Sequence, residues 1–144
     1  MTVRKEVVSV LAILPCREDR ASLEEIFAHS KWDLHHAEAL RPAVPLIEQV
    51  KSGVVITDDR LPDGTWRDVL EHLQRRRDAP PLVVVSRLAD EALWAEVLNH
   101  GGFDVLPTPF EARAVIWSIT VAWQHWSYKC DAKVAGSAAG QRDT

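Results

Sequence analysis

Five short runs rich in branched aliphatic residues alternate with five longer amphipathic segments, and this alternation constrains the fold more than any other feature of the chain. The runs that we expect to form strands are residues 7–14, 32–37, 54–57, 82–86 and 103–106. The segments that we expect to form helices are residues 18–29, 42–51, 66–76, 90–100 and 111–128. Strands that alternate with helices in this way predict a parallel sheet with helices on both faces.

The predicted topology is an α/β, flavodoxin-like fold whose five-stranded parallel sheet has the order 2-1-3-4-5. Right-handed crossover connections leave few other arrangements of five such units. Functional sites in sheets of this kind lie at the carboxyl ends of the strands. The segments in which we expect a site are residues 15–19, 58–62, 86–87 and 107–110.

The composition is that of a globular domain without a strong charge bias. Of the 144 residues, 47% are hydrophobic and 26% charged, and the formal net charge is −4. The absence of a basic stripe argues against nucleic acid as a partner. No apolar stretch is long enough to span a bilayer, and residues 7–14 fit a buried strand better than a signal peptide, so we expect a cytoplasmic protein without a membrane partner. One domain is expected over residues 1–128, followed by a small, polar and disordered tail over residues 129–144.

Three motifs at the predicted strand ends occur in an informative order. Residues 58–64 read DDRLPDG, so that Asp58 directly follows the third apolar run. Ser86 ends the fourth run, and the sequence TPF at residues 108–110 ends the fifth. This order resembles the response-regulator receiver family over residues 6–126.

The resemblance implies a place in two-component, phosphorelay signal transduction. In this family the aspartate at the Asp58 position accepts a phosphoryl group, and a histidine kinase or a phosphotransfer protein is the partner. A hydroxyl at the Ser86 position donates to the phosphoryl group, and a lysine at the Thr108 position supplies a cation. An acidic pair after the first strand holds Mg²⁺ together with the phosphoacceptor, in keeping with that ion's preference for oxygen ligands.

This chain departs from the family pattern at the metal site and at the lysine, which places it in a divergent subgroup. Alignment on Arg20 puts the acidic pair at Leu14 and Pro15, whose side chains bind no metal. Among the family's metal-binding positions, only that of Asp58 then keeps a candidate ligand for Mg²⁺, and Thr108 supplies no charge. Losing a metal and a cation together weakens stabilisation of the transition state by several kcal/mol.

Other residues near these strand ends have simpler explanations. Glu18 and Asp19 favour the start of a helix through its dipole; the alternative is that one of them turns toward the site. Asp59 is expected to point to the opposite side of the strand end from Asp58. The aromatic residue that reports phosphorylation in the family is replaced by Val105, and Phe103 is expected on the same strand face as Val105, as a packing residue.

The chain contains six tryptophans, and its last helix is apolar on more than one face. Residues 115, 119, 122 and 126 form the stripe expected to face the sheet. The candidate interface comprises Trp94, Trp117, Val121 and Trp123. It would serve a partner protein or a homodimer through the last helix; the alternative is that neighbouring side chains cover these rings.

Two functional hypotheses follow, and neither requires an enzyme. The first is a single-domain receiver in which Asp58 accepts a phosphoryl group and shifts a pre-existing conformational equilibrium. The second is a pseudo-receiver, an interaction module whose binding needs no phosphoryl transfer. The retained Asp58 and Ser86 favour the first, and the absent acidic pair and lysine favour the second. A small hydrolase at the same strand ends is a distant third, because no nucleophile–base spacing is present.

Overall fold

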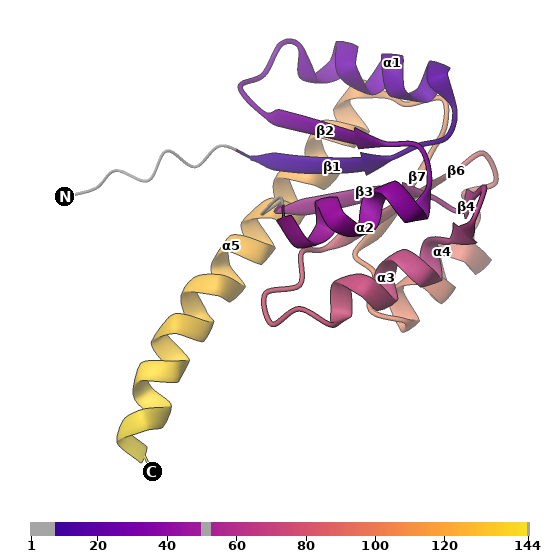
Figure 1. Ribbon diagram of the computed structural model, residues 1–144. Helices are drawn as coiled ribbons and strands as arrows, with labels where there is room; N and C mark the ends of the chain where they lie inside the picture. The colour runs from indigo at the N-terminus through magenta and orange to yellow at the C-terminus, as the bar shows by residue number, and fades with distance from the viewer. Residues whose placement is uncertain (1–7, 50–52, 144) are drawn as a thin grey trace.

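The main sheet has five parallel strands in the order β2-β1-β3-β6-β7, which confirms the predicted fold (Figure 1). The computed structural model describes residues 8–49 and 53–143, with side chains as far as residue 129. The strands of this sheet are β1 (Ser9–Ile13), β2 (Asp33–Ala37), β3 (Val54–Asp58), β6 (Leu82–Ser86) and β7 (Asp104–Pro107). The carboxyl ends of β1, β3, β6 and β7 therefore meet at one edge, where a site was expected.

Helices cover both faces of the sheet. They are α1 (Arg17–Phe27), α2 (Leu40–Gln49), α3 (Trp66–Gln74), α4 (Glu91–Asn99) and α5 (Ala112–Asp143). The buried cluster on one face contains residues of α1 and α5, and the cluster on the other face contains residues of α2, α3 and α4. The sheet is thus the middle layer of three, with the candidate site at one of its ends (Figure 1).

The middle strands carry side chains that are buried on both faces. In β1, Val10 and Ala12 pack into the cluster with α1 and α5, whereas Leu11 and Ile13 pack into the opposite one. All four are fully buried. This alternation explains why the sequence of a central parallel strand reads as a continuous apolar run rather than an amphipathic one.

Close packing and one hydrogen bond hold the helix α5 against the amino-terminal edge of the sheet. A Cβ atom at Gly53, just before β3, would lie 2.6 Å from Cδ1 of Trp123, so the approach of the helix requires glycine there. The indole Nε1–H of Trp126 donates to the carbonyl oxygen of Asp78 over 2.9 Å. These contacts fix the direction in which α5 leaves the domain (Figure 1).

Two elements differ from the sequence prediction. The helix α5 continues to Asp143 instead of ending near residue 128, and this helical backbone differs from the disordered tail predicted over residues 129–144. The alanines of that segment favour a helix through their high intrinsic propensity. In addition, β4 (Arg60–Leu61) and β5 (Gly64–Thr65) form a small antiparallel hairpin that is not among the five predicted strands.

Asp63 does more than shape the turn of this hairpin. Its two carboxylate oxygens accept hydrogen bonds from the backbone N–H groups of Leu40 and Arg41, over 2.7 and 2.9 Å. These bonds to Arg41 and Leu40 lower the pKa of Asp63 below its usual value. The carboxylate thus caps α2 from a distant part of the chain, which joins the hairpin after β3 to the helix before it.

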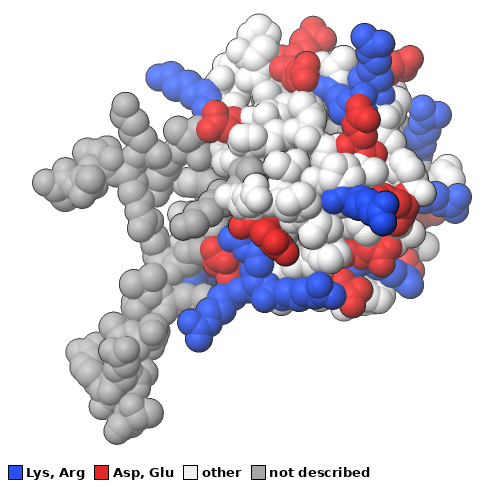
Figure 2. All heavy atoms as spheres, viewed as in Figure 1, with Lys and Arg blue, Asp and Glu red and all other residues white. Residues whose placement is uncertain are grey.

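Charged side chains of both signs are interspersed on the face of the molecule shown in Figure 2. Lys and Arg side chains lie beside Asp and Glu side chains over much of this face, and no continuous positive stripe is visible there. Among the helices of the described part of the chain, none is both long and apolar enough to cross a membrane.

Candidate functional site

The three motifs expected to form a site meet at the carboxyl edge of the sheet. Asp58 is the last residue of β3 and pairs with Val85 of β6, one residue before Ser86. Thr108 lies directly after β7, and its backbone N–H donates to the carbonyl oxygen of Ser86 over 3.1 Å. The sequence therefore placed Asp58, Ser86 and Thr108 together correctly, whatever chemistry they carry out.

The Ser86 hydroxyl, however, is bonded to Asp59. Its Oγ donates to Oδ2 of Asp59 over 3.1 Å and accepts the backbone N–H of Leu88 over 3.0 Å. The side chain is almost completely buried, at 4% exposure. The Ser86 hydroxyl thus both donates and accepts a hydrogen bond within the protein. A ligand at Asp58 would have to compete with the Asp59 carboxylate for the hydroxyl proton of Ser86.

The prediction that Asp59 points away from Asp58 was wrong. Strand alternation holds only while the strand continues, and β3 ends at Asp58. The chain bends at residue 59 although the Asp59 N–H still donates to the carbonyl oxygen of Val85 over 3.0 Å. The bend brings the carboxylate of Asp59 to the same edge as Asp58 and Ser86.

Asp58 lies in an environment that disfavours its charged form. Burial raises its pKa to about 6, helped by a hydrogen bond with the Asp59 side chain and by the negative charges of Asp59 and Asp19. A hydrogen bond from the backbone N–H of Arg60 to Oδ1, over 3.3 Å, acts in the opposite direction and lowers the pKa. The surroundings of Asp58 are therefore negative, which is the reverse of what a phosphoryl group requires.

At the end of β1, the backbone is bound to a cationic side chain. The guanidinium of Arg20 donates to the carbonyl oxygens of Leu14 and Pro15 over 2.7 and 2.9 Å. It also lies 3.2 Å from a carboxylate oxygen of Glu38. Leu14 itself is fully buried in the core. Arg20 thus occupies the acceptors of this strand end and brings a positive charge to them.

Receiver domains generally bind Mg²⁺ beside the phosphoacceptor, but the donor set of this chain does not fit that ion. Leu14 and Pro15 offer no side-chain oxygen, and their carbonyl groups are taken by Arg20. Residues 8–49 and 53–129 contain no group of three His, Cys, Asp or Glu side chains placed to hold a metal. Mg²⁺ prefers near-octahedral oxygen ligands, and the carboxylates of Asp58 and Asp59 alone do not build such a site.

The candidate interface residues differ in exposure. Trp117 of α5 is 72% exposed and Trp94 of α4 is 49% exposed. Val121 and Trp123 are only partly exposed, and Trp123 packs against the core cluster beside Gly53. Of the four, Trp94 and Trp117 are therefore the two that present large apolar surfaces to solvent.

The predicted relation between Phe103 and Val105 was wrong. Phe103 packs against the cluster that contains α1 and α5, whereas Val105 packs against the opposite one. Strand β7 begins at Asp104, so alternation does not extend back to Phe103. Phe103 remains a packing residue, with its ring 5.7 Å from that of His125.

Sequence reasoning missed the roles of Asp59 and Arg20. An aspartate pair after a strand gave a signal for Asp59, but the bend that turns its side chain inward has no local signature. Arg20 was used as a marker for alignment, and its spacing of five and six residues from two backbone carbonyl groups is informative only once the turn between β1 and α1 is known.

Comparison with known proteins agrees with this geometry. The family model described as "Response regulator receiver domain" matches residues 17–120. The chain is 30% identical over 89 residues to the transcriptional regulatory protein FixJ of Rhizobium meliloti, which covers 62% of the chain and 42% of FixJ. It is 27% identical over 92 residues to the response regulator protein PilR of Pseudomonas aeruginosa, which covers 64% of the chain and 21% of PilR. The matches thus span less than half of either relative.

Solved structures share the fold. The receiver domain of the Francisella response regulator 1452 has a TM-score of 0.74 at 20% identity, and the match covers 81% of this chain and 97% of that one. The beryllofluoride-activated NtrC4 receiver domain dimer has a TM-score of 0.76 at 18% identity, and the match covers 83% and 99% of the two chains.

Replacing Asp58 with asparagine is expected to stabilise the protein above pH 6 and to leave its stability near pH 4 unchanged. Because the folded state holds this proton more tightly than the unfolded state, wild type loses stability as the pH rises from about 4 to about 6. Screening of the half-exposed carboxyl group reduces the expected gain at pH 7 to about 1 kcal/mol.

The measurement is urea unfolding of wild type and Asp58→Asn at several pH values. Glu25→Gln, which removes an exposed carboxylate from α1, is the control and is expected to show no such growing difference. A difference between Asp58→Asn and wild type that is largest at low pH would contradict the proposed environment of Asp58.

Proposed function

Because the chain belongs to the response-regulator receiver family, we propose that it acts in two-component signalling as a binding module whose protein contacts do not require a phosphoryl group on Asp58. The observation that carries this proposal is the set of partners around Asp58 and Ser86. The hydroxyl that would serve the phosphoryl group is bonded to Asp59, and the nearby charges that act on Asp58 are negative.

Electrostatics favour this proposal over ordinary phosphorylation. A phosphoryl group adds a charge of about −1.5 to −2 at neutral pH. Two like unit charges 4 Å apart near a protein surface repel by roughly 4 kcal/mol, enough to slow a reaction about a thousandfold. Thr108 brings no cation to offset Asp59 and Asp19, and Arg20 is bonded to carbonyl groups at the end of β1.

The second candidate is a receiver in which Asp58 still accepts a phosphoryl group. The observation that favours it is the retained geometry of the strand ends. Asp58 ends β3, Ser86 ends β6, and the backbone of Thr108 is bonded to that of Ser86. In that case Asp59 would have to release the Ser86 hydroxyl, and a histidine kinase or a phosphotransfer protein would supply the phosphoryl group.

We place the partner surface on α4 and α5, around Trp94 and Trp117. Exposed aromatic side chains are enriched at protein interfaces, where they bury much area for little loss of conformational entropy. Ile116, at 43% exposure, continues the apolar surface beside Trp117. A second copy of the chain is the partner that we propose for this surface, through the last helix; the similar NtrC4 receiver is described as a dimer.

Treatment of the protein with acetyl phosphate and Mg²⁺ is expected to leave its intact mass unchanged. The double variant Pro15→Asp/Thr108→Lys supplies a carboxylate at the end of β1 and a cation after β7. A phosphoryl adduct is expected only in that variant, because it restores the two missing electrostatic supports.

Mass spectrometry over a time course provides the measurement, with a receiver that retains the acidic pair treated in parallel. An adduct that forms on wild type at a comparable rate and is lost in Asp58→Asn would overturn the proposal in favour of the second candidate.

Substitution of Trp117 with glutamate is expected to weaken self-association about tenfold or more, as loss of a central aromatic contact does. Sedimentation equilibrium over a range of concentrations measures the effect. Ala112→Glu places the same charge at an exposed position at the start of α5, away from Trp117, and is expected to leave association unchanged. A wild-type chain that stays monomeric at every concentration would rule out the homodimer.

A further inference from the structure

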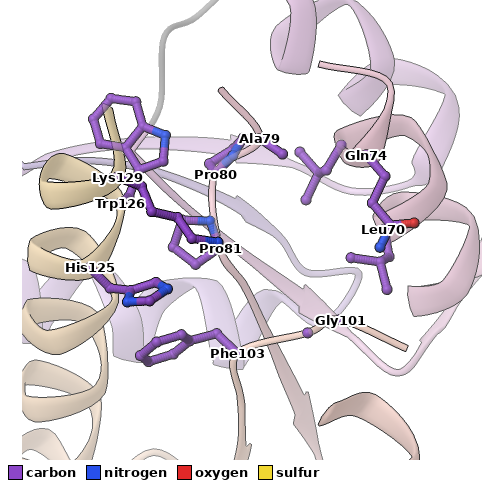
Figure 3. A pocket seen from close by; sticks show the side chains of 12 residues that line it. Leu70, Gln74, Ala79, Pro80, Pro81, Gly101, Phe103, His125, Trp126 and Lys129 are labelled. Atoms are coloured by element: carbon purple, nitrogen blue, oxygen red, sulfur yellow. The ribbon is translucent and has the colours of Figure 1, made fainter. Parts of the chain in front are cut away.

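A cavity of about 290 Å³ lies between α3 and α5, across the starts of β6 and β7 (Figure 3). Pro80 and Pro81 lead into β6 on one side, and Gly101 and Phe103 lead into β7 on the other. This is the amino-terminal edge of the sheet, whereas Asp58 and Ser86 lie at the carboxyl edge. The cavity is therefore separate from the site described above.

The walls of the cavity are held in place without a ligand. Trp126 is fixed by its hydrogen bond to the carbonyl oxygen of Asp78. Two consecutive prolines restrict the backbone that forms the floor. Gly101 has a φ of 102°, a conformation that favours glycine, and its lack of a side chain leaves the wall open beside Gln74. A cavity built in this way is preformed, as binding sites for small molecules usually are.

The lining combines aromatic rings with cationic and hydrogen-bonding groups. Phe103, His125 and Trp126 contribute three ring systems, and the first two lie 5.7 Å apart at a tilt of 43°. Lys129 contributes an ammonium group and Gln74 an amide (Figure 3). Among the residues whose side chains the structure describes, those that line the cavity include no aspartate or glutamate.

We propose that this cavity binds a small planar aromatic anion, such as an aryl carboxylate. Aromatic walls favour a flat ring, because ring pairs gain energy beyond the area that they bury. The ammonium group of Lys129, which lines the cavity, favours a negative charge on the ligand. A volume of about 290 Å³ lies at the lower end of the range for small-molecule pockets, which favours a ligand of one or two rings.

Occupation of the cavity would couple α3 to α5. Leu70, Leu73 and Gln74 belong to α3, whereas His125, Trp126 and Lys129 belong to α5. A ligand that contacts both helices stabilises their present relative position, by its binding free energy. Because α5 also carries Trp117, the ligand would stabilise the position of α5, and with it that of Trp117, without involving Asp58.

The test uses benzoate and indole-3-carboxylate as probes and the indole N–H resonance of Trp126 as the readout, assigned with Trp126→Phe. Both carboxylates are expected to shift this resonance saturably in two-dimensional ¹H–¹⁵N spectra of the full chain. The neutral amides of the same acids are expected to bind more weakly, by roughly two- to fivefold, as the loss of one exposed ion pair predicts.

Two variants make the result specific to the cavity. Lys129→Glu is expected to weaken the carboxylates at least as much as the amide replacement does, whereas Lys31→Glu, at an exposed position outside the cavity, is the matched control. Ala79→Leu fills part of the volume and is expected to abolish binding while the circular dichroism spectrum stays unchanged. The absence of a shift of the Trp126 resonance up to millimolar probe would overturn the proposal. So would equal affinity of the acids and the amides, together with unchanged binding of the acids by the Lys129→Glu variant. Neither result bears on phosphorylation of Asp58.

Discussion

The hydrogen bond from Ser86 to Asp59 joins the ends of β6 and β3, and the character of the functional edge depends on it. This bond holds the carboxyl group of Asp59 beside that of Asp58. It also withdraws the buried hydroxyl from Asp58. Ser86, Asp59 and Asp58 thus form a polar cluster whose hydrogen bonds are made within the protein.

The scaffold that supports this cluster is ordinary, and its departures are confined to the site. The central strands are buried on both faces, so the strand order and register are strongly determined. At the end of β1, Leu14 is fully buried, and Arg20 binds the carbonyl groups of Leu14 and Pro15. This strand end is thus packed into the core and bound to a cationic side chain.

The order of the strands and the edge that carries the site followed from the alternation of strands and helices, together with the crossover and strand-end rules for parallel sheets. Periodicity identifies which residues face the core, and parallel topology then brings Asp58, Ser86 and Thr108 to one edge. The orientation of Asp59 and the side of the sheet on which Phe103 packs did not follow. Both residues lie one position outside a strand, where alternation no longer applies.

Features that depend on distant segments were also beyond the reach of the sequence. The capping of α2 by Asp63 joins residues more than twenty positions apart. The cavity between α3 and α5 is formed by segments around residues 70–74, 79–81, 101–103 and 125–129. None of these segments has a local sequence pattern that predicts a binding site, because the cavity forms only when α3 and α5 pack against the sheet.

The central claim is that Asp58 lies among negative groups and that the described residues around it do not form a metal site. The most direct measurement is the ¹³Cγ chemical shift of Asp58 as a function of pH, with and without millimolar Mg²⁺. The account predicts a pKa of about 6 that Mg²⁺ leaves unchanged. A pKa at or below the ordinary value of 3.8, or one that Mg²⁺ lowers substantially, would contradict it.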